Sequence, residues 1–134
     1  MAVDRNFTAL DWISSELDEV LNAATQSLNQ WLQKTDDEAQ LRFCLSYLHQ
    51  SAASLRMVEC YGVAVLAEEL ELLCHAIINS RVAEVSRATS VLRKGIESLP
   101  NFVKAAGAER ADDPLPLLPI INDIRAVRSH NLFS

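Results

Sequence analysis

The spacing of apolar residues is the feature that most constrains how this chain folds. From residue 10 onward, apolar side chains recur at every third or fourth position, which is the period of an α-helix with one buried face. The chain has 134 residues but only three glycines and four prolines, too few turn residues for a protein of many β-strands. A chain of this length forms one domain around one core. We therefore predict a single domain of the all-α class.

Two helices have recognisable starting signals. Thr8 and Asp11 have the spacing of a capping box, so the first helix is expected to begin there and to end at Lys34. The Thr-Asp-Asp-Glu run at residues 35–38 then places carboxylates where the positive end of a helix dipole favours them. The second helix is expected to start in this run and to continue to about residue 58.

The next two helices are bounded by glycine, proline and small polar residues. Gly62 permits a tight turn ahead of a third helix, although a single glycine can also lie inside a continuous helix. The third helix is expected to stop at residues 79–80. A fourth helix begins at Val82. Pro100 is expected to kink or break it, because the ring removes a backbone donor and crowds the preceding turn.

Four long helices joined by short connections pack as an up-down four-helix bundle, and a short extra C-terminal helix is expected to cover one side of it. That fifth helix begins near Pro119, after a polar linker over residues 105–113. The predicted organisation is an N-terminal extension (1–7), a helical bundle domain (8–128) and the start of a linker (129–134).

The charge of the chain argues against a nucleic-acid partner. Twelve Lys and Arg against 18 Asp and Glu give a net charge of −6, whereas nucleic-acid binders carry basic patches. Residues 8–41 hold seven acids and one base, Lys34, so this segment alone accounts for the excess. No apolar run is long enough to insert into a membrane, and the amino terminus lacks the layout of a secretion signal. We expect a cytoplasmic protein.

Candidate residues for metal or covalent chemistry do not converge. Cys44, Cys60 and Cys74 lack paired C-x-x-C spacing, and we interpret them as buried thiols of a reducing compartment. Cys74 and His75 point about 100° apart on a helix, so they do not converge on a metal ion. As a nucleophile pair they lack a third orienting group and an oxyanion site at recognisable spacing. The carboxylates at positions 68, 69 and 71 are interpreted as the solvated face of the third helix. We expect neither cofactor nor metal, and no enzymatic activity in this segment.

One histidine stands out from the other two. His75 and His130 are interpreted as structural or incidental. His49 lies beside the seam residue Leu48, at the edge of the predicted bundle. Arg42 and Arg56 each stand seven residues from His49, which places all three on one flank of the second helix. The sequence therefore predicts a basic strip on an acidic protein.

Several segments carry a family resemblance. A histidine in the second helix of a bundle, followed by small residues and by Leu-Ala-Glu-Glu-Leu-Glu at 66–71, resembles histidine phosphotransfer (Hpt) domains of bacterial phosphorelays. The segments 42–50, 57–62 and 115–126 are similar, more narrowly, to the amino-terminal domain of the ChpA/PilL family. These are CheA-type hybrid histidine kinases of type IV pilus chemosensory systems, and FimL-type scaffold proteins are related to them.

The resemblance implies an Hpt-like domain with altered chemistry. Active Hpt domains have lysine three residues and glycine four residues after the histidine, whereas this chain has Ala52 and Ala53. We therefore expect a docking domain that is degenerate for phosphotransfer, in a protein that controls pilus and twitching motility. Its partners would be response-regulator receiver domains or scaffold proteins of the pathway.

Two alternatives remain open. In the first, His49 is the phospho-acceptor of an active phosphotransfer domain, and Arg42, Gln50 and Arg56 hold the phosphoryl group. In the second, exposed apolar residues such as Trp12 or Phe43 form a seam for self-association. If the parent chain resembles ChpA/PilL, kinase and adaptor domains would lie beyond this segment.

Overall fold

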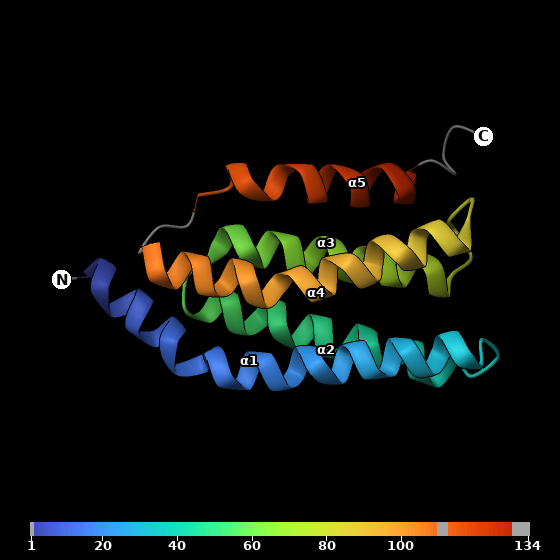
Figure 1. Cartoon of the computed structure of the whole chain (residues 1–134), viewed down its shortest axis with the longest axis horizontal. Coiled ribbons are helices and arrows are strands. Elements are labelled where there is room, and N and C mark those ends of the chain that lie inside the picture. Colours follow the sequence, from blue (N-terminus) through green and yellow to red (C-terminus); the bar gives the residue numbers. More distant parts are fainter. Residues whose placement is uncertain (1, 110–112, 130–134) are drawn as a thin grey trace.

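The computed structural model describes residues 2–109 and 113–129, and these form helices without a β-strand. The elements are α1 (Ala2–Gln33), α2 (Glu38–Met57), α3 (Tyr61–Ile78), α4 (Val85–Glu109), the 3-10 helix η1 (Leu115–Leu117) and α5 (Leu118–Ser129). The four long helices run up and down side by side, and α5 lies along α3 and α4, away from α1 and α2 (Figure 1). The predicted all-α bundle with a short extra C-terminal helix is confirmed.

The core is made of the residues that the helical period placed on the inner faces. Its largest fully buried side chains come from all five α-helices: Leu10, Leu28, Leu41, Leu48, Leu55, Leu66, Leu70, Leu73, Leu92, Ile96, Leu99 and Ile124. Each buried side chain of this size stabilises the fold by about 1.5–3 kcal/mol relative to an exposed one. The central element is α3, which contacts α2, α4, α5 and η1.

The first helix is longer than predicted. It begins at Ala2, so Thr8 and Asp11 lie inside α1 and the predicted capping box is wrong. Residues 2–7 contain no glycine or proline, and nothing in their sequence stops a helix from extending through them. The end of α1 at Gln33 and the start of α2 at Glu38 agree with the sequence pattern.

The turn between α2 and α3 is centred on Glu59 rather than on Gly62. Glu59 has a φ of 63°, and the N–H of Cys60 donates to the carbonyl of Leu55 at 2.9 Å. This is the bonding pattern of a left-handed helix end, which glycine usually supplies but a short loop can impose on another residue. Gly62 lies in the first turn of α3. Ser80, with a φ of 57°, ends α3 in the same way.

Pro100 lies inside α4, so of the two predicted outcomes, a kink or a break, the break is wrong. Leu99 and Val103 are both buried, so the apolar stripe of the helix is continuous across the proline. Burial of that stripe outweighs the one backbone hydrogen bond that the ring removes. The helix starts at Val85, not Val82, and continues to Glu109, through most of the expected linker. Residues 110–112 lie outside the described part.

The C-terminal helix was predicted correctly in type and place. It begins at Leu118 with Pro119 in its first turn, and Ile121, Ile124 and Val127 are buried beneath it. His130 and the predicted linker at 130–134 lie outside the described residues. None of the helices that the structure describes is both long and apolar enough to cross a membrane.

Candidate functional site

His49 lies on the outer edge of α2, as its position beside Leu48 predicted. Its side chain is 73% exposed, and Nδ1 lies 2.8 Å from Oε2 of Glu71 on α3. An ionised carboxylate can only accept a hydrogen bond, so the ring donates through Nδ1–H. Glu71 therefore holds the imidazole in one orientation and leaves Nε2 at the surface.

Arg56 pairs with a second carboxylate of α3. Its Nε and Nη2 donate to the two oxygens of Glu68, at 2.5 and 2.7 Å, in a forked arrangement. The hydrogen bonds to Glu68, followed by its negative charge, raise the pKa of the Arg56 guanidinium. The Arg56–Glu68 pair therefore connects α2 to α3, on one side of the His49–Glu71 contact.

Arg42 has its partner on its own helix. Its Nε lies 3.3 Å from Oε2 of Glu38, one turn earlier in α2. Arg42, His49 and Arg56 thus share a flank of α2, but each faces a carboxylate. The predicted basic strip is therefore not a free positive surface, because acids from α2 and α3 neutralise it.

Gln50 is separated from these residues. It lines a small cleft of about 30 Å³ between α1 and α2, together with Ile13 and Ser54, whereas Glu71 approaches His49 from the side of α3. The structure does not bring Gln50 together with Arg42 and Arg56, and the grouping of these residues as a phosphate site stays a prediction.

The two alanines that follow His49 occupy different environments. Ala52 is buried in the core, whereas Ala53 is exposed. A lysine at position 52 would have to bury its stem and thread its ammonium out past the neighbouring helices. The alanine at 52 is thus a core residue of this bundle.

The carboxylates of α3 are not a solvated face, and this correction concerns Glu69 most. Only 10% of its side chain is exposed, and it accepts from Arg125 at 3.1 and 3.0 Å and from Arg128 at 3.0 Å. Both arginines come from α5, so this cluster fastens α5 to the centre of the bundle. The signal in the sequence is the position of Glu69 between Leu66 and Leu70, where a core residue is expected.

Exposed apolar side chains surround the paired charges. Met57 on α2 and Tyr61 and Leu72 on α3 are all about half or more exposed, and Tyr61 is close enough to influence Arg56 electrostatically. We call the surface formed by these residues together with the three ion pairs the α2–α3 face: Glu38, Arg42, His49, Arg56, Met57, Tyr61, Glu68, Glu71 and Leu72. It is close to neutral and partly apolar.

The cysteines and the remaining histidine have structural surroundings. Cys44, Cys60 and Cys74 are free and buried, as predicted. A hydrogen bond with Cys44, followed by burial, raises the pKa of the Cys74 thiol. His75 is exposed and lies 2.8 Å from the side-chain nitrogen of Asn79. Within the described ranges, no three His, Cys, Asp or Glu side chains are grouped so as to hold a metal ion.

The chain is similar to a scaffold protein. It is 26% identical to the scaffold protein FimL of Pseudomonas aeruginosa over 118 residues, which is 88% of this chain and 21% of FimL. The chain thus spans about a fifth of the length of that relative. Neither a family model nor a solved structure matches it.

This similarity covers nearly the whole bundle. Because it extends over 118 of the 134 residues, it includes most of α2 and α3. The expected likeness to a FimL-type scaffold protein is confirmed at this level. The narrower resemblance to ChpA/PilL kinases and to Hpt domains stays a prediction.

Proposed function

We propose that this chain is an Hpt-like docking domain of a type IV pilus chemosensory protein and that it binds other proteins of the pathway through the α2–α3 face. The observation that carries the proposal is the pairing on this face. Arg56 and His49 are held by Glu68 and Glu71, so their positions are fixed before any partner arrives. The similarity to a scaffold protein supports a binding role over a catalytic one.

The composition of the face suits a protein partner. Tyr61, Leu72 and Met57 are exposed around a nearly neutral patch, and interfaces of this kind place aromatic and apolar anchors inside a polar rim. We propose a receiver domain of a response regulator, or a scaffold protein of the same pathway, as the partner. Nucleic acid and membrane insertion form no part of the proposal.

The apolar anchors give the sharpest test. Tyr61→Ala and Leu72→Ala are expected to weaken binding of a purified receiver domain or pathway scaffold protein at least tenfold by isothermal titration calorimetry. Leu115→Ala is the matched control, because Leu115 is also exposed but lies in η1. Equal binding by all three variants and the wild type would place the docking face elsewhere.

The charged pair gives a second test. Arg56→Glu places a like charge against Glu68 and is expected to weaken partner binding. Adding Glu68→Arg restores the pair with its charges reversed. If the partner contacts Arg56 through its charge, the double variant still binds the partner weakly. If binding depends only on the local structure that the pair maintains, the double variant binds as the wild type does. Recovery would exclude direct recognition of Arg56.

An active phosphotransfer domain is the second candidate function, and the His49–Glu71 contact favours it. With Nδ1–H donated to Glu71, Nε2 keeps its lone pair and can attack the phosphorus of a receiver aspartyl phosphate. A P–N bond forms, the anhydride P–O bond breaks, and the aspartate leaves as a carboxylate. Arg42 and Arg56 would have to leave their carboxylates to hold the phosphoryl oxygens.

This second candidate is tested directly by phosphoryl transfer. A radiolabelled phospho-receiver is incubated with the domain, and acid-labile label on the wild type but not on His49→Gln would establish the relay. The docking proposal expects no label on either protein. It also expects His49→Gln to bind the receiver within about threefold of the wild type, since the imidazole is one contact among several.

A further inference from the structure

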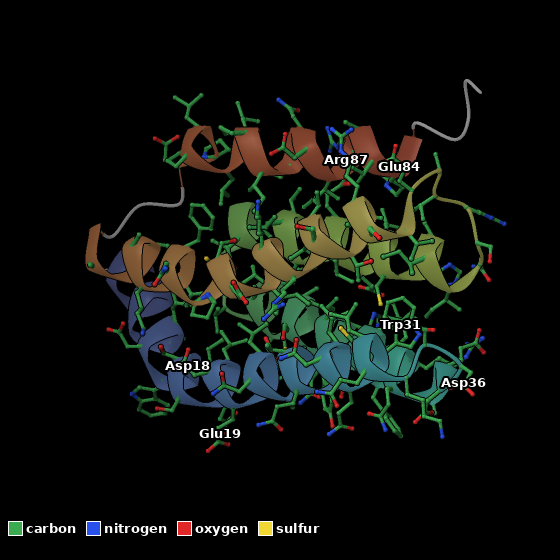
Figure 2. The ribbon with its side chains drawn as sticks, turned by 45° about the vertical axis from the view of Figure 1, so that its right-hand side comes forward. Asp18, Glu19, Trp31, Asp36, Glu84 and Arg87 are labelled. Carbon is green, nitrogen blue, oxygen red and sulfur yellow. The ribbon has the colours of Figure 1, made fainter. Side chains whose placement is uncertain are left out.

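A second exposed face lies on α1, among residues that the proposed function does not use. Trp12 is 83% exposed although tryptophan is usually well buried. Glu16 and Glu19 follow it by one and two helical turns, so the three side chains share the side of α1 that faces away from the core residues Leu10 and Leu17. Figure 2 shows Glu19 pointing away from the bundle.

The acids of this face differ from the carboxylates of α2 and α3 in having no counter-ion. Four carboxylates lie among the α1 side chains that the structure describes, and none of them forms an ion pair: Asp11, Glu16, Asp18 and Glu19. Each carboxylate on α2 and α3, by contrast, has a basic or imidazole partner: Glu38, Glu68, Glu69 and Glu71. The unpaired negative charge is concentrated around an exposed indole.

A groove of about 330 Å³ lies between α1 and the end of α4. Leu10 and Val103 supply apolar walls, and Asp11 lies at its edge. Gly107 keeps the groove open there, since a Cβ at this position would lie 3.2 Å from Oδ1 of Asp11. Lys104 lines the side that belongs to α4. Because Leu10 and Ser14 lie across the helix from Trp12, the groove is separate from the surface around the exposed indole.

We propose that this α1 face, defined as Asp11, Trp12, Glu16, Asp18 and Glu19, docks an amphipathic basic helix of another protein. The apolar positions of that helix pack on Trp12, and its lysines or arginines face Glu16 and Glu19. Tryptophan is the residue most enriched at interface hot spots, and the charge is complementary. The inference goes beyond the proposed function, because the two faces share no residue and allow the domain to bridge two partners.

A second copy of the chain does not fit this face. Across a two-fold axis the same surface meets itself, so the four unpaired acids of one copy would face those of the other. A basic partner removes this repulsion, and a copy increases it.

The test uses Trp12 as its own reporter. The chain has two tryptophans, and the other, Trp31, is 7% exposed, so Trp31→Phe leaves Trp12 as the sole emitter. A synthetic amphipathic helix of leucine and lysine is the probe, with its leucine–glutamate counterpart as the control peptide. We expect the basic peptide alone to shift Trp12 emission to the blue. If Trp31→Phe fails to fold, the difference between the wild type and Trp12→Phe reports the same signal.

Matched charge variants separate the face from general attraction to an acidic protein. Glu16→Gln with Glu19→Gln removes two charges from the α1 face. Asp36→Asn with Asp37→Asn removes two charges from the α1–α2 connection, where neither acid forms an ion pair among the described residues. We expect the first pair, and Trp12→Ala, to weaken peptide binding at least tenfold, and the second pair to change it less than threefold.

Four results would overturn the inference. They are an unchanged Trp12 emission, equal losses in the two charge pairs, a blue shift that grows with protein concentration without peptide, and a blue shift with neutral phosphatidylcholine vesicles. The third would indicate a second copy and the fourth a lipid surface. Tyr61→Ala and Leu72→Ala should leave peptide binding unchanged, so this experiment tests the α1 face independently of the proposed function.

Discussion

Glu71 on α3 and His49 on α2 lie 2.8 Å apart, and their contact fixes which nitrogen of the imidazole carries the proton. The ring otherwise projects into solvent, with no further partner for Nε2 among the described residues. A neutral histidine has one donor and one acceptor nitrogen, and the hydrogen bond that one nitrogen makes decides the state of the other. Glu71 thus makes Nε2 the acceptor and the nucleophilic atom.

Removal of this carboxylate should redistribute the two neutral tautomers of His49. In the wild type at a pH where the ring is neutral, we expect the Nδ1–H form to predominate, because Glu71 accepts its hydrogen bond. In Glu71→Ala that preference is lost, and the Nε2–H form should increase. Nitrogen-15 chemical shifts of the labelled ring measure the change. His75, which contacts Asn79 instead, provides the internal control. A His49 spectrum identical in both proteins would refute the fixed orientation.

Glu69 should control how firmly α5 is attached. Glu69→Gln removes the charge that Arg125 and Arg128 share, and the loss should be about 1–3 kcal/mol, because Glu69 is nearly buried while Arg125 remains half exposed to water. We expect the amides of α5 to lose about fivefold or more in hydrogen-exchange protection, with α1 and α2 unchanged.

Glu97→Gln is the matched control for this experiment. Glu97 pairs with Arg93 one turn earlier on the exposed side of α4, at 3.3 Å. Such surface pairs contribute about 0–1 kcal/mol, so α5 protection should not change. If Glu69→Gln left α5 as protected as the control does, the apolar contacts of Ile121 and Ile124 alone would hold the helix.

The extent to which sequence predicted this fold depends on the range of the interactions involved. The period of apolar residues indicated all five helices, because it reports directly which face of each helix is buried. The path through Pro100 and the left-handed turn at Glu59 were missed. Both are local penalties, and the packing of distant helices outweighs them.

The candidate site shows the same division. The exposure of His49 and its alignment with Arg42 and Arg56 follow from spacing along one helix. Glu68 and Glu71 lie on another helix, and sequence spacing does not give the rotation of α3 against α2 that brings them opposite. The charge on the flank was therefore predicted as positive when the structure makes it neutral.

Two glycines of α4 should respond to alanine in opposite ways. A Cβ at Gly95 would collide with the side chain of Leu70, which is fully buried in α3. Overpacking of this kind costs about 1–3 kcal/mol, more than the gain of about 1 kcal/mol in helix propensity. At Gly107 the added carbon would lie 3.2 Å from Oδ1 of Asp11, on an exposed side chain that can turn away, and at an ordinary contact distance of 3.8 Å from Cδ2 of Leu10.

Denaturant unfolding of the two variants measures this difference. Gly95→Ala should have a lower midpoint than the wild type, whereas Gly107→Ala should be equal or higher. The pair controls for helix propensity, because both substitutions lie in the same helix. Equal midpoints would mean that α3 and α4 separate readily enough to admit the methyl group.

The buried thiol of Cys74 should make the bundle less stable at alkaline pH. Its hydrogen bond with Cys44 and its burial raise its pKa above the value of about 8.5 that a cysteine has in the unfolded chain. Above that pH the unfolded state loses the proton while the folded state keeps it. The unfolded state then binds fewer protons, and the free energy of unfolding falls as pH rises, by about 1.4 kcal/mol per pH unit from this group. Below pH 8 both states are protonated and the group adds no slope.

Cys74→Ala removes the titrating thiol and isolates its contribution. The variant loses some packing at every pH, but its free energy of unfolding should decline less steeply than that of the wild type above pH 8.5. Urea titrations at several alkaline pH values give the two slopes. The tyrosines and lysines titrate in both proteins, so their effects cancel in the difference. Parallel slopes would mean that Cys74 ionises as readily in the folded bundle as in the unfolded chain, and would contradict a thiol held protonated by Cys44 and the core.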